Sequence, residues 1–199
     1  GRQRARTHWP AVRQSDMLAM VLRDFHDNAA PPYRDRVDYA ADLDELLNEM
    51  LFSDLEQVVN RIDKLEAAVK KPIPDREQRL RELELMQRCR DALESERPMK
   101  EVVSGEAEAK TIRAFAFLTL KPAVVVVNCD EGGVPDDAPQ RVGPYEAIFL
   151  SAKIEEEIAA LDADERGQFL DEMGIAVPAA DRLIRACYES LDLVSFFTT

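Results

Sequence analysis

Polar residues directly follow two apolar runs that have the composition of buried β-strands. The runs lie at 123–127 and 147–150. The polar residues are Asn128, Cys129, Asp130 and Glu131 after the first run, and Ser151, Ala152 and Lys153 after the second. In open α/β sheets, ligands bind beyond the carboxyl ends of the strands. We therefore expect a ligand site here, with amide, carboxylate, hydroxyl and amine groups available for hydrogen bonds.

The order of these residues predicts the kind of ligand. An Asn-x-x-acid pattern at one strand end, followed by Ser-Ala-Lys at the next, is the base-binding pair of the GTPase superclass. Either pattern alone arises often by chance, whereas the two in this order, each at a strand end, form a more specific signal. The predicted base-binding residues are Asn128, Glu131, Ser151, Ala152 and Lys153. The alternative is an ordinary turn, since asparagine favours turns and an acid before Gly132 and Gly133 also suits one.

No pattern for binding phosphates accompanies the base-binding pair. A phosphate-binding loop requires Gly-x-x-x-x-Gly-Lys-Ser/Thr, in which backbone N–H groups approach the phosphates and the hydroxyl holds Mg²⁺. None of the seven glycines stands in such a pattern, and the Asp-x-x-Gly element that follows the γ-phosphate is absent. His8 and His26 lack partners at recognisable spacing, and the three cysteines lack CxxC spacing. We therefore expect no catalytic residue and no metal ligand in this chain.

The segments around the two strands predict an alternating α/β sheet. A six-residue apolar segment at 17–22 has the length of a further buried strand, and 106–118 has the pattern of a helix. Capping signals predict further helices from 154, over 162–174 and over 178–191. Such alternation is typical of a sheet covered by helices.

A helical hairpin interrupts this alternation. Apolar residues over 51–69 follow alternating steps of four and three, which place one seam along a helix at coiled-coil spacing. The Pro-Ile-Pro sequence at 72–74 ends that helix, and a capping-box pattern at 75–78 opens a second helix with its own apolar stripe. An antiparallel hairpin lets the two stripes cover each other. The predicted domains are 1–41 with 97–199, a partial nucleotide-binding α/β domain, and 42–96, the hairpin insertion.

A further set of motifs resembles a known family. The segment Leu-Thr-Leu-Lys-Pro at 118–122 leads through the valine run to Asn128 and Glu131, and this combination resembles the YchF and Obg-like ATPase family. Other stretches similar to that family are 54–56, 151–155, 161–166, 181–186 and 196–198. The resemblance covers nearly the whole chain. It implies an α/β fold class, a partial Ras-like P-loop NTPase domain with a parallel sheet, interrupted by an antiparallel helical-hairpin (coiled-coil) insertion.

The resemblance also implies which ligand is bound. Typical GTPases have Asn-Lys-x-Asp, whereas here Cys129 replaces the lysine and the longer Glu131 replaces the aspartate, so guanine selection is weakened. In the family this departure goes with a preference for ATP. Asn128 would then hydrogen-bond the adenine edge, and backbone groups around 151–153 would complete the pocket wall. The implied cofactor is ATP or GTP, with Mg²⁺ in the intact family protein but not bound by this chain alone.

Measured against the family, the chain resembles a fragment or a degenerate homologue. It lacks the Walker A region, and the family's C-terminal TGS domain would begin just after Thr199. We therefore expect an ATP- or GTP-hydrolysing family but a chain that is inactive by itself. The link from Gly132 to Pro144 is also too short and too rich in glycine and proline to hold the usual crossover helix. Whether Ser151 faces the base is left open by this deletion.

Charge restricts the choice of partners. The chain has 26 basic and 39 acidic residues and a formal charge of -13, so its averaged surface repels a phosphate backbone. A local basic cluster is predicted at the hairpin tip, formed by Lys70, Lys71, Arg76, Arg79 and Arg81. The family's ribosome association suggests contact with ribosomal RNA there, and the alternative is a solvated helix end. A second function follows from the same cluster: a non-catalytic helical-hairpin interaction module that binds a ribosomal or protein partner.

The sequence also predicts where the protein is found. No apolar run approaches the roughly 18–20 residues that span a bilayer, and no hydrophobic signal core follows the arginine-rich start. We therefore expect a cytoplasmic protein without membrane contact.

Overall fold

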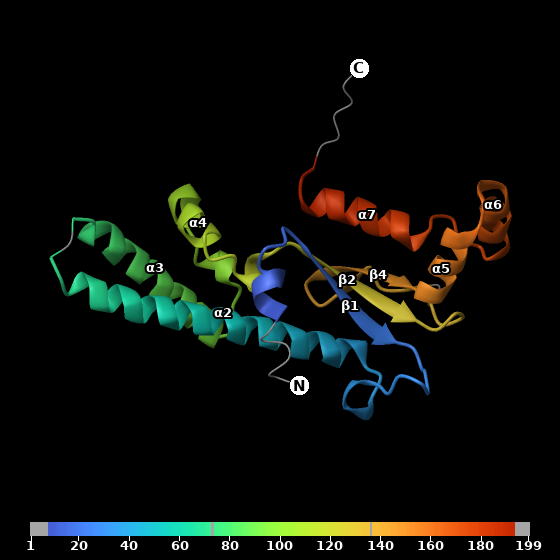
Figure 1. The fold of residues 1–199 in the computed structure, drawn as a ribbon, viewed down its shortest axis with the longest axis horizontal. Coiled ribbons are helices and arrows are strands. Elements are labelled where there is room, and N and C mark those ends of the chain that lie inside the picture. The colour runs from blue at the N-terminus through green and yellow to red at the C-terminus, as the bar shows by residue number, and fades with distance from the viewer. Residues whose placement is uncertain (1–7, 73, 136, 194–199) are drawn as a thin grey trace, which may run out of the picture. The chain divides into compact units, whose positions relative to one another are not determined.

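The computed structural model describes residues 8–72, 74–135 and 137–193 (Figure 1). The chain divides into two compact units, each assembled from separate stretches of sequence. One unit combines Gly1–Asp16 with Glu45–Lys121, and the other combines Met17–Asp44 with Pro122–Thr199. The hairpin lies in the first unit and the sheet in the second. The sequence predicted a different kind of division, into an α/β domain (1–41 with 97–199) and an inserted hairpin (42–96). That domain division stays a prediction.

A four-stranded mixed sheet forms the core of the second unit. Its order is β1 (Leu18–Asp24), β2 (Ala123–Cys129), β4 (Tyr145–Leu150) and β3 (Arg141–Val142). β1, β2 and β4 are parallel, as predicted from the three apolar runs, and β3 is antiparallel to β4. The valines at 124–127 are all buried, because β2 lies between β1 and β4 and both of its faces are covered.

Helices of the second unit cover both faces of this sheet. The helix α7 (Ala179–Ser190) lies along one face, where its alanines pack against Val124 and Ile148 (Figure 1). The first turn of α2 (Tyr39–Val69) lies on the other face, where the Tyr39 ring meets Phe149 edge-on at 5.6 Å between centroids. Alternate residues of the buried strands therefore face different helices.

The connection from β2 to β4 explains how two parallel strands are joined without a helix. The described part of the link, which leaves out only residue 136, contains turns and β3 but no helix. Because β3 runs antiparallel to β4, it carries the chain back to the amino end of β4. Gly143 follows β3 with φ of +58°, a conformation that hairpin turns require and that glycine adopts without strain. The predicted loss of the crossover helix is therefore compensated by a short hairpin.

Two further helices lie between β4 and α7. They are α5 (Ala152–Ala160) and α6 (Ala163–Glu172). Asp162 caps α6, accepting hydrogen bonds from the backbone N–H groups of Asp164 at 3.1 Å and Glu165 at 3.0 Å. Gly174 ends α6 with φ of +67°. These boundaries agree with the helices predicted from the capping signals.

The first unit is built around the predicted hairpin, with α2 and α3 (Arg76–Glu94) as its two arms. Its core contains Val58, Ile62 and Leu65 from α2, packed with residues of α3 that include Met86 and Cys89. An ion pair also joins the arms, since the Arg61 guanidinium donates to both carboxylate oxygens of Glu82 at 2.7 and 2.8 Å. The heptad steps correctly predicted the packing face of α2. The apolar stripe correctly predicted α3 and most of its packing face, although Leu80 of that stripe is exposed.

Two local predictions in this unit are wrong. Asp75 stands before α3 but makes no capping bond, because its carboxylate accepts instead from Arg79 Nε at 2.8 Å. The helix expected over 106–118 is the shorter α4 (Gly105–Arg113). Beyond α4, Ala116 has a positive φ of 48°, and the chain turns so that the buried Phe117 ring stacks on Phe115. Burial of an aromatic side chain outweighs continuation of the helix.

Two of the family-like motifs meet within this unit. The Asp54 side chain in α2 is fully buried and accepts hydrogen bonds from the backbone N–H groups of Leu118 at 3.0 Å and Thr119 at 2.8 Å. It also accepts from the Thr119 hydroxyl at 2.9 Å and from the Arg13 guanidinium at 2.7 Å. The pattern at 54–56 and the pattern at 118–122 are therefore two sides of one buried polar network. The last motif, at 196–198, and the Ile73 of the hairpin turn lie outside the described residues.

Candidate functional site

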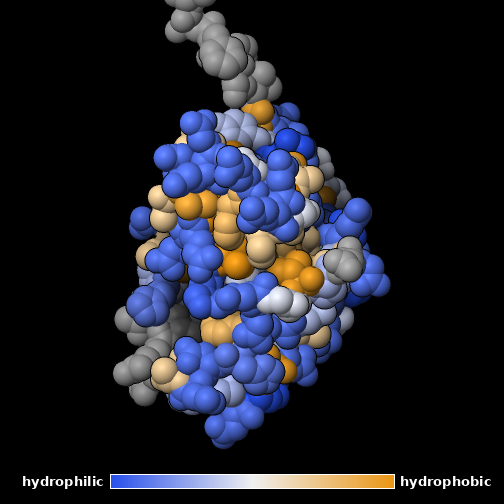
Figure 2. All heavy atoms as spheres, turned by 90° about the vertical axis from the view of Figure 1, so that its right-hand side faces the viewer, coloured by the Kyte–Doolittle hydropathy of each residue, from blue (hydrophilic) through white to orange (hydrophobic). Residues whose placement is uncertain are grey.

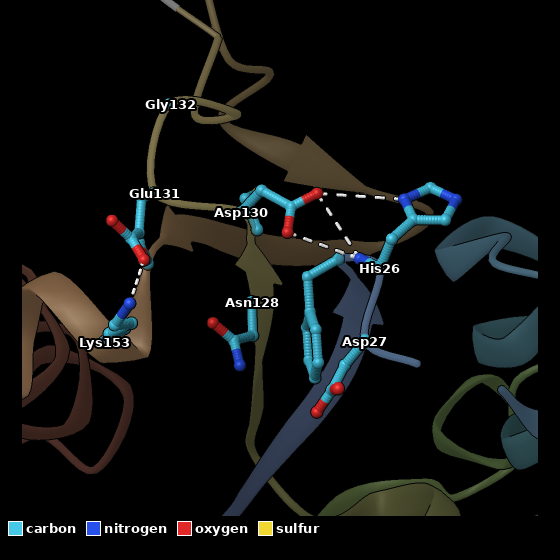
Figure 3. A pocket seen from close by; sticks show the side chains of 10 residues that line it. His26, Asp27, Asn128, Asp130, Glu131, Gly132 and Lys153 are labelled. Atoms are coloured by element: carbon cyan, nitrogen blue, oxygen red, sulfur yellow. Dashed lines mark hydrogen bonds and ion pairs between the residues drawn. The ribbon is translucent and has the colours of Figure 1, made fainter. Parts of the chain in front are cut away.

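A cavity of about 600 Å³ opens at the carboxyl ends of β1, β2 and β4 (Figure 3). We call it the strand-end cavity. It is lined by Phe25, His26, Asp27, Asn128, Cys129, Asp130, Glu131, Gly132, Ser151 and Lys153. Four of the five predicted base-binding residues are in this lining. The fifth, Ala152, reaches it through a backbone hydrogen bond to Asn128.

Asn128 joins two of the elements that form the cavity. Its Oδ1 accepts a hydrogen bond from the backbone N–H of Ala152 at 2.9 Å, which ties the end of β2 to the start of α5. Only the oxygen of an amide can accept, so this bond also fixes which way the amide points. Ser151 is 6% exposed and lines the same cavity at the N-cap position of α5. Ser151 therefore lies in the same cavity lining as Asn128, despite the short link between β2 and β4.

Glu131 and Lys153 form an ion pair at the rim of the cavity. Lys153 Nζ contacts Glu131 Oε1, and Figure 3 shows the two side chains directed toward each other from the β2 loop and from α5. The side chains are 52% and 65% exposed respectively. The hydrogen bond and the negative charge of Glu131 raise the pKa of Lys153 above its ordinary value, so the amine is protonated at neutral pH.

Asp130 and His26 form a second contact, which sequence spacing did not reveal. The backbone N–H of His26 lies 3.3 Å from each carboxylate oxygen of Asp130, and the imidazole Nδ1 lies 3.7 Å from Oδ2. His26 follows the end of β1, the strand end at which the sequence motifs indicated no ligand residue. The signal was available, because all parallel strands of a sheet end at the same edge.

The Cys129 side chain is a neutral part of the cavity wall. It is 3% exposed, and burial raises the pKa of the thiol, with further contributions from the charges of Asp24 and Asp130. A buried, protonated thiol is a poor nucleophile. Cys129 therefore supplies volume to the cavity and no reactivity.

A smaller cavity of about 280 Å³ adjoins the strand-end cavity and shares Glu131, Gly132 and Ser151 with it. Its wall includes Val134 and Met173, which are 39% and 45% exposed. Figure 2 shows the corresponding side of the structure, where hydrophilic side chains surround a hydrophobic area. The apolar wall lies between the β2–β4 link and the loop after α6.

Most of the cationic side chains predicted at the hairpin tip are engaged within the hairpin. Arg76 Nε donates to the carbonyl oxygen of Val69 at 3.1 Å. Arg79 pairs with Asp75 and Arg81 pairs with Glu77, each four residues apart on one helix. Lys70 and Lys71 are exposed at the end of α2. The positive charge at the tip is thus carried mainly by the two lysines and by Arg76, whose carbonyl partner is neutral.

The described residues offer neither a metal-binding cluster nor a membrane-spanning helix. They contain no group of three or more histidine, cysteine, aspartate or glutamate side chains that could hold a metal ion. Across the same ranges, every helix is too short or too polar to cross a membrane.

The comparisons with known proteins agree with the fold and with the family resemblance. No family model matches the chain. Relatives described as ribosome-binding ATPase YchF are 32% identical over 197 residues in Bacillus subtilis and 30% identical over 194 residues in Haemophilus influenzae. Both alignments cover 94% of this chain and 53% of the relative, so the chain spans about half the length of the curated relatives it matches.

A solved structure shows the same fold. The structure of the Schizosaccharomyces pombe YchF GTPase matches 92% of this chain and 52% of its own chain, with a TM-score of 0.76 and 20% identity. The predicted α/β fold with a helical-hairpin insertion is therefore confirmed. In sequence and in fold, the chain is related along nearly its whole length to the YchF family that its motifs resemble.

Proposed function

We propose that this chain is the base-recognising portion of the nucleotide-binding domain of a YchF-like, translation-associated NTPase. The observation that carries the proposal is the hydrogen bond between Asn128 Oδ1 and the N–H of Ala152. It brings the two base-binding motifs together at the edge of the sheet where α/β proteins bind ligands. The relatives named ribosome-binding ATPases support the same class of function.

The groups of the strand-end cavity fit an adenine ring. The Asn128 amide has two N–H donors and a second lone pair on Oδ1 beyond the one used by Ala152. An amide in this orientation donates to adenine N7 and accepts from the exocyclic amine, as it does in other adenine sites. Ser151, Ala152 and Lys153 then contribute the adjacent wall. ATP is therefore the nucleotide that we propose for the intact protein, with GTP bound less well.

Phosphate chemistry is assigned to the longer relatives rather than to this chain. Its 199 residues hold no phosphate-binding loop, and the strand-end cavity is lined by the carboxylates of Asp27, Asp130 and Glu131. Such a lining suits a base and repels phosphates. We propose that the intact protein hydrolyses the nucleotide with Mg²⁺, whereas this chain only recognises the base.

A titration with AMP tests base recognition directly. Nuclear magnetic resonance of the ¹⁵N-labelled chain should show shifts near 25–27, 128–132 and 151–153. Asn128→Asp keeps an acceptor for the Ala152 N–H but loses both donors, so AMP affinity should fall about tenfold, the scale of one bidentate base contact. Asn60→Ala, an exposed change on α2, is the matched control. Shifts confined to other regions, or an Asn128→Asp variant that binds normally, would rule out the proposed site.

A second candidate function is a hairpin interaction module. Lys70 and Lys71 of this chain are exposed at the end of α2, and the similar proteins of Bacillus subtilis and Haemophilus influenzae are named ribosome-binding ATPases. A pair of exposed lysines is suited to contact phosphate groups of ribosomal RNA. This function is compatible with base recognition, because the two sites lie in different compact units.

A further inference from the structure

The two consecutive acids after β2 turn to opposite walls of the strand-end cavity. Figure 3 shows the Asp130 carboxylate directed toward His26 and the Glu131 carboxylate directed toward Lys153. Both contacts are hydrogen bonds: Asp130 accepts from the His26 backbone N–H, and Glu131 accepts from Lys153 Nζ. Each acid at the position where a base would be read therefore already has a partner within the protein.

Guanine and adenine place different demands on such acids. Guanine presents two adjacent N–H groups, on N1 and on the exocyclic amine, and a carboxylate is the acceptor that matches both. Adenine presents one exocyclic amine beside ring nitrogens that accept, and an amide such as Asn128 satisfies it without a carboxylate. Guanine loses affinity when the carboxylate that should accept both of its donors is held in another direction, because its buried N–H groups are then left unpaired.

We propose that Lys153 contributes to base choice by holding the Glu131 carboxylate toward α5, so that the cavity favours adenine over guanine. This inference rests on the proposed function. The presence of Glu131 in place of the aspartate of typical GTPases then accounts for only part of the preference for adenine. The longer side chain reaches across to α5, and Lys153 holds it there. Lys153 is a specificity-determining residue that acts through Glu131.

The size of the effect follows from the exposure of the pair. Both side chains are more than half exposed, and exposed ion pairs hold their partners only weakly. Removing Lys153 should therefore raise the affinity for GMP relative to AMP by about three- to fivefold, which is the range that such pairs provide. Using the ratio of the two monophosphates removes any effect of Lys153 on phosphate binding.

The experiment measures AMP and GMP dissociation constants for the ¹⁵N-labelled chain and three variants. Lys153→Ala should shift the ratio toward GMP, and the double variant Lys153→Ala with Glu131→Gln should lose that gain, because the amide cannot accept both guanine donors. Lys110→Ala, an exposed lysine change within α4, is the matched control and should leave the ratio unchanged. Raising the ionic strength should shift the wild-type ratio in the same direction as Lys153→Ala but leave the ratio of that variant constant.

The outcomes separate this inference from the proposed function. If AMP shifts the cavity resonances but Lys153→Ala leaves the AMP-to-GMP ratio unchanged, the role of Lys153 is wrong while base recognition stands. A gain in GMP affinity that persists in the double variant also overturns it, since Glu131 would then not be the acceptor. If neither nucleotide shifts the cavity resonances of the wild-type chain, base recognition and this inference both fail.

Discussion

Individual polar side chains hold the two motif regions in place. Asp54 and Ser151 are the buried polar or charged residues within the described ranges, and each belongs to a family-like motif. Asp54 satisfies two backbone N–H groups, a hydroxyl and a guanidinium at once. Its carboxylate is the acceptor for both N–H groups and for the Thr119 hydroxyl, whereas Arg13 also donates to the Ala116 carbonyl oxygen and to the Ser53 hydroxyl.

Replacing Asp54 tests this explanation. Asp54→Ala should lower the free energy of unfolding by about 3–5 kcal/mol, because Arg13 would lose its carboxylate partner and the two N–H groups would be left without an acceptor. Urea unfolding of the variant and the wild type measures the difference. Glu77→Ala, which removes an exposed ion pair on α3, is the control and should cost less than about 1 kcal/mol. If Asp54→Ala also costs less than about 1 kcal/mol, Asp54 does not hold the two motif regions in place.

At the level of the elements, the hairpin depends on a core that is closed to water. Cys89 of α3 is 0% exposed and packs with Val58 and Met86 in that core. Burial raises the pKa of the Cys89 thiol to about 11, with the charge of Arg88 opposing the shift and that of Glu108 adding to it. The folded chain therefore keeps this proton at a pH where the unfolded chain releases it.

This difference predicts a pH dependence of stability. A group whose pKa is raised on folding contributes stability below its unfolded pKa, and that contribution is lost as pH rises toward the folded value. Between about pH 8 and about pH 10.5, the wild type should therefore lose about 2 kcal/mol more unfolding free energy than Cys89→Ala. Urea unfolding at both pH values gives the comparison. Equal losses in the two proteins would show that the thiol ionises without opening the hairpin core.

At the level of the whole molecule, net charge limits the second proposed function, which is binding of ribosomal RNA by the hairpin. The formal charge of -13 opposes nucleic-acid binding, so any contact with ribosomal RNA depends on local cations. Lys70 and Lys71 are exposed, whereas Arg79 and Arg81 are paired within α3. The two lysines should therefore dominate binding at the hairpin tip.

Ribosome co-sedimentation of the chain tests that expectation. The double variant Lys70→Ala with Lys71→Ala should weaken binding and reduce the salt slope by about 1–2, as expected for two lost phosphate contacts. The variant Arg79→Ala with Arg81→Ala carries the same change in net charge and should have a smaller effect. Equal effects of the two variants would indicate general charge repulsion and no specific contact at the tip.

Local patterns were sufficient to predict the elements and their motifs. The apolar valines predicted β2, the alternating steps of four and three predicted α2, the apolar stripe after the Pro-Ile-Pro sequence predicted α3, and the capping signal at Asp162 predicted α6. These features depend on residues close together in the chain. The same is true of the strand ends, which correctly placed Asn128 and Ser151 at one edge of a parallel sheet.

The tertiary structure decided the contacts between distant segments. The antiparallel return through β3, the pairing of His26 with Asp130 and the ion pair of Lys153 with Glu131 join residues with no local pattern to connect them. Position in the chain determines which side chains reach the edge of the sheet. Strand order and register then determine which of them touch, because a polar contact requires an approach to within about 3 Å that periodicity alone does not specify.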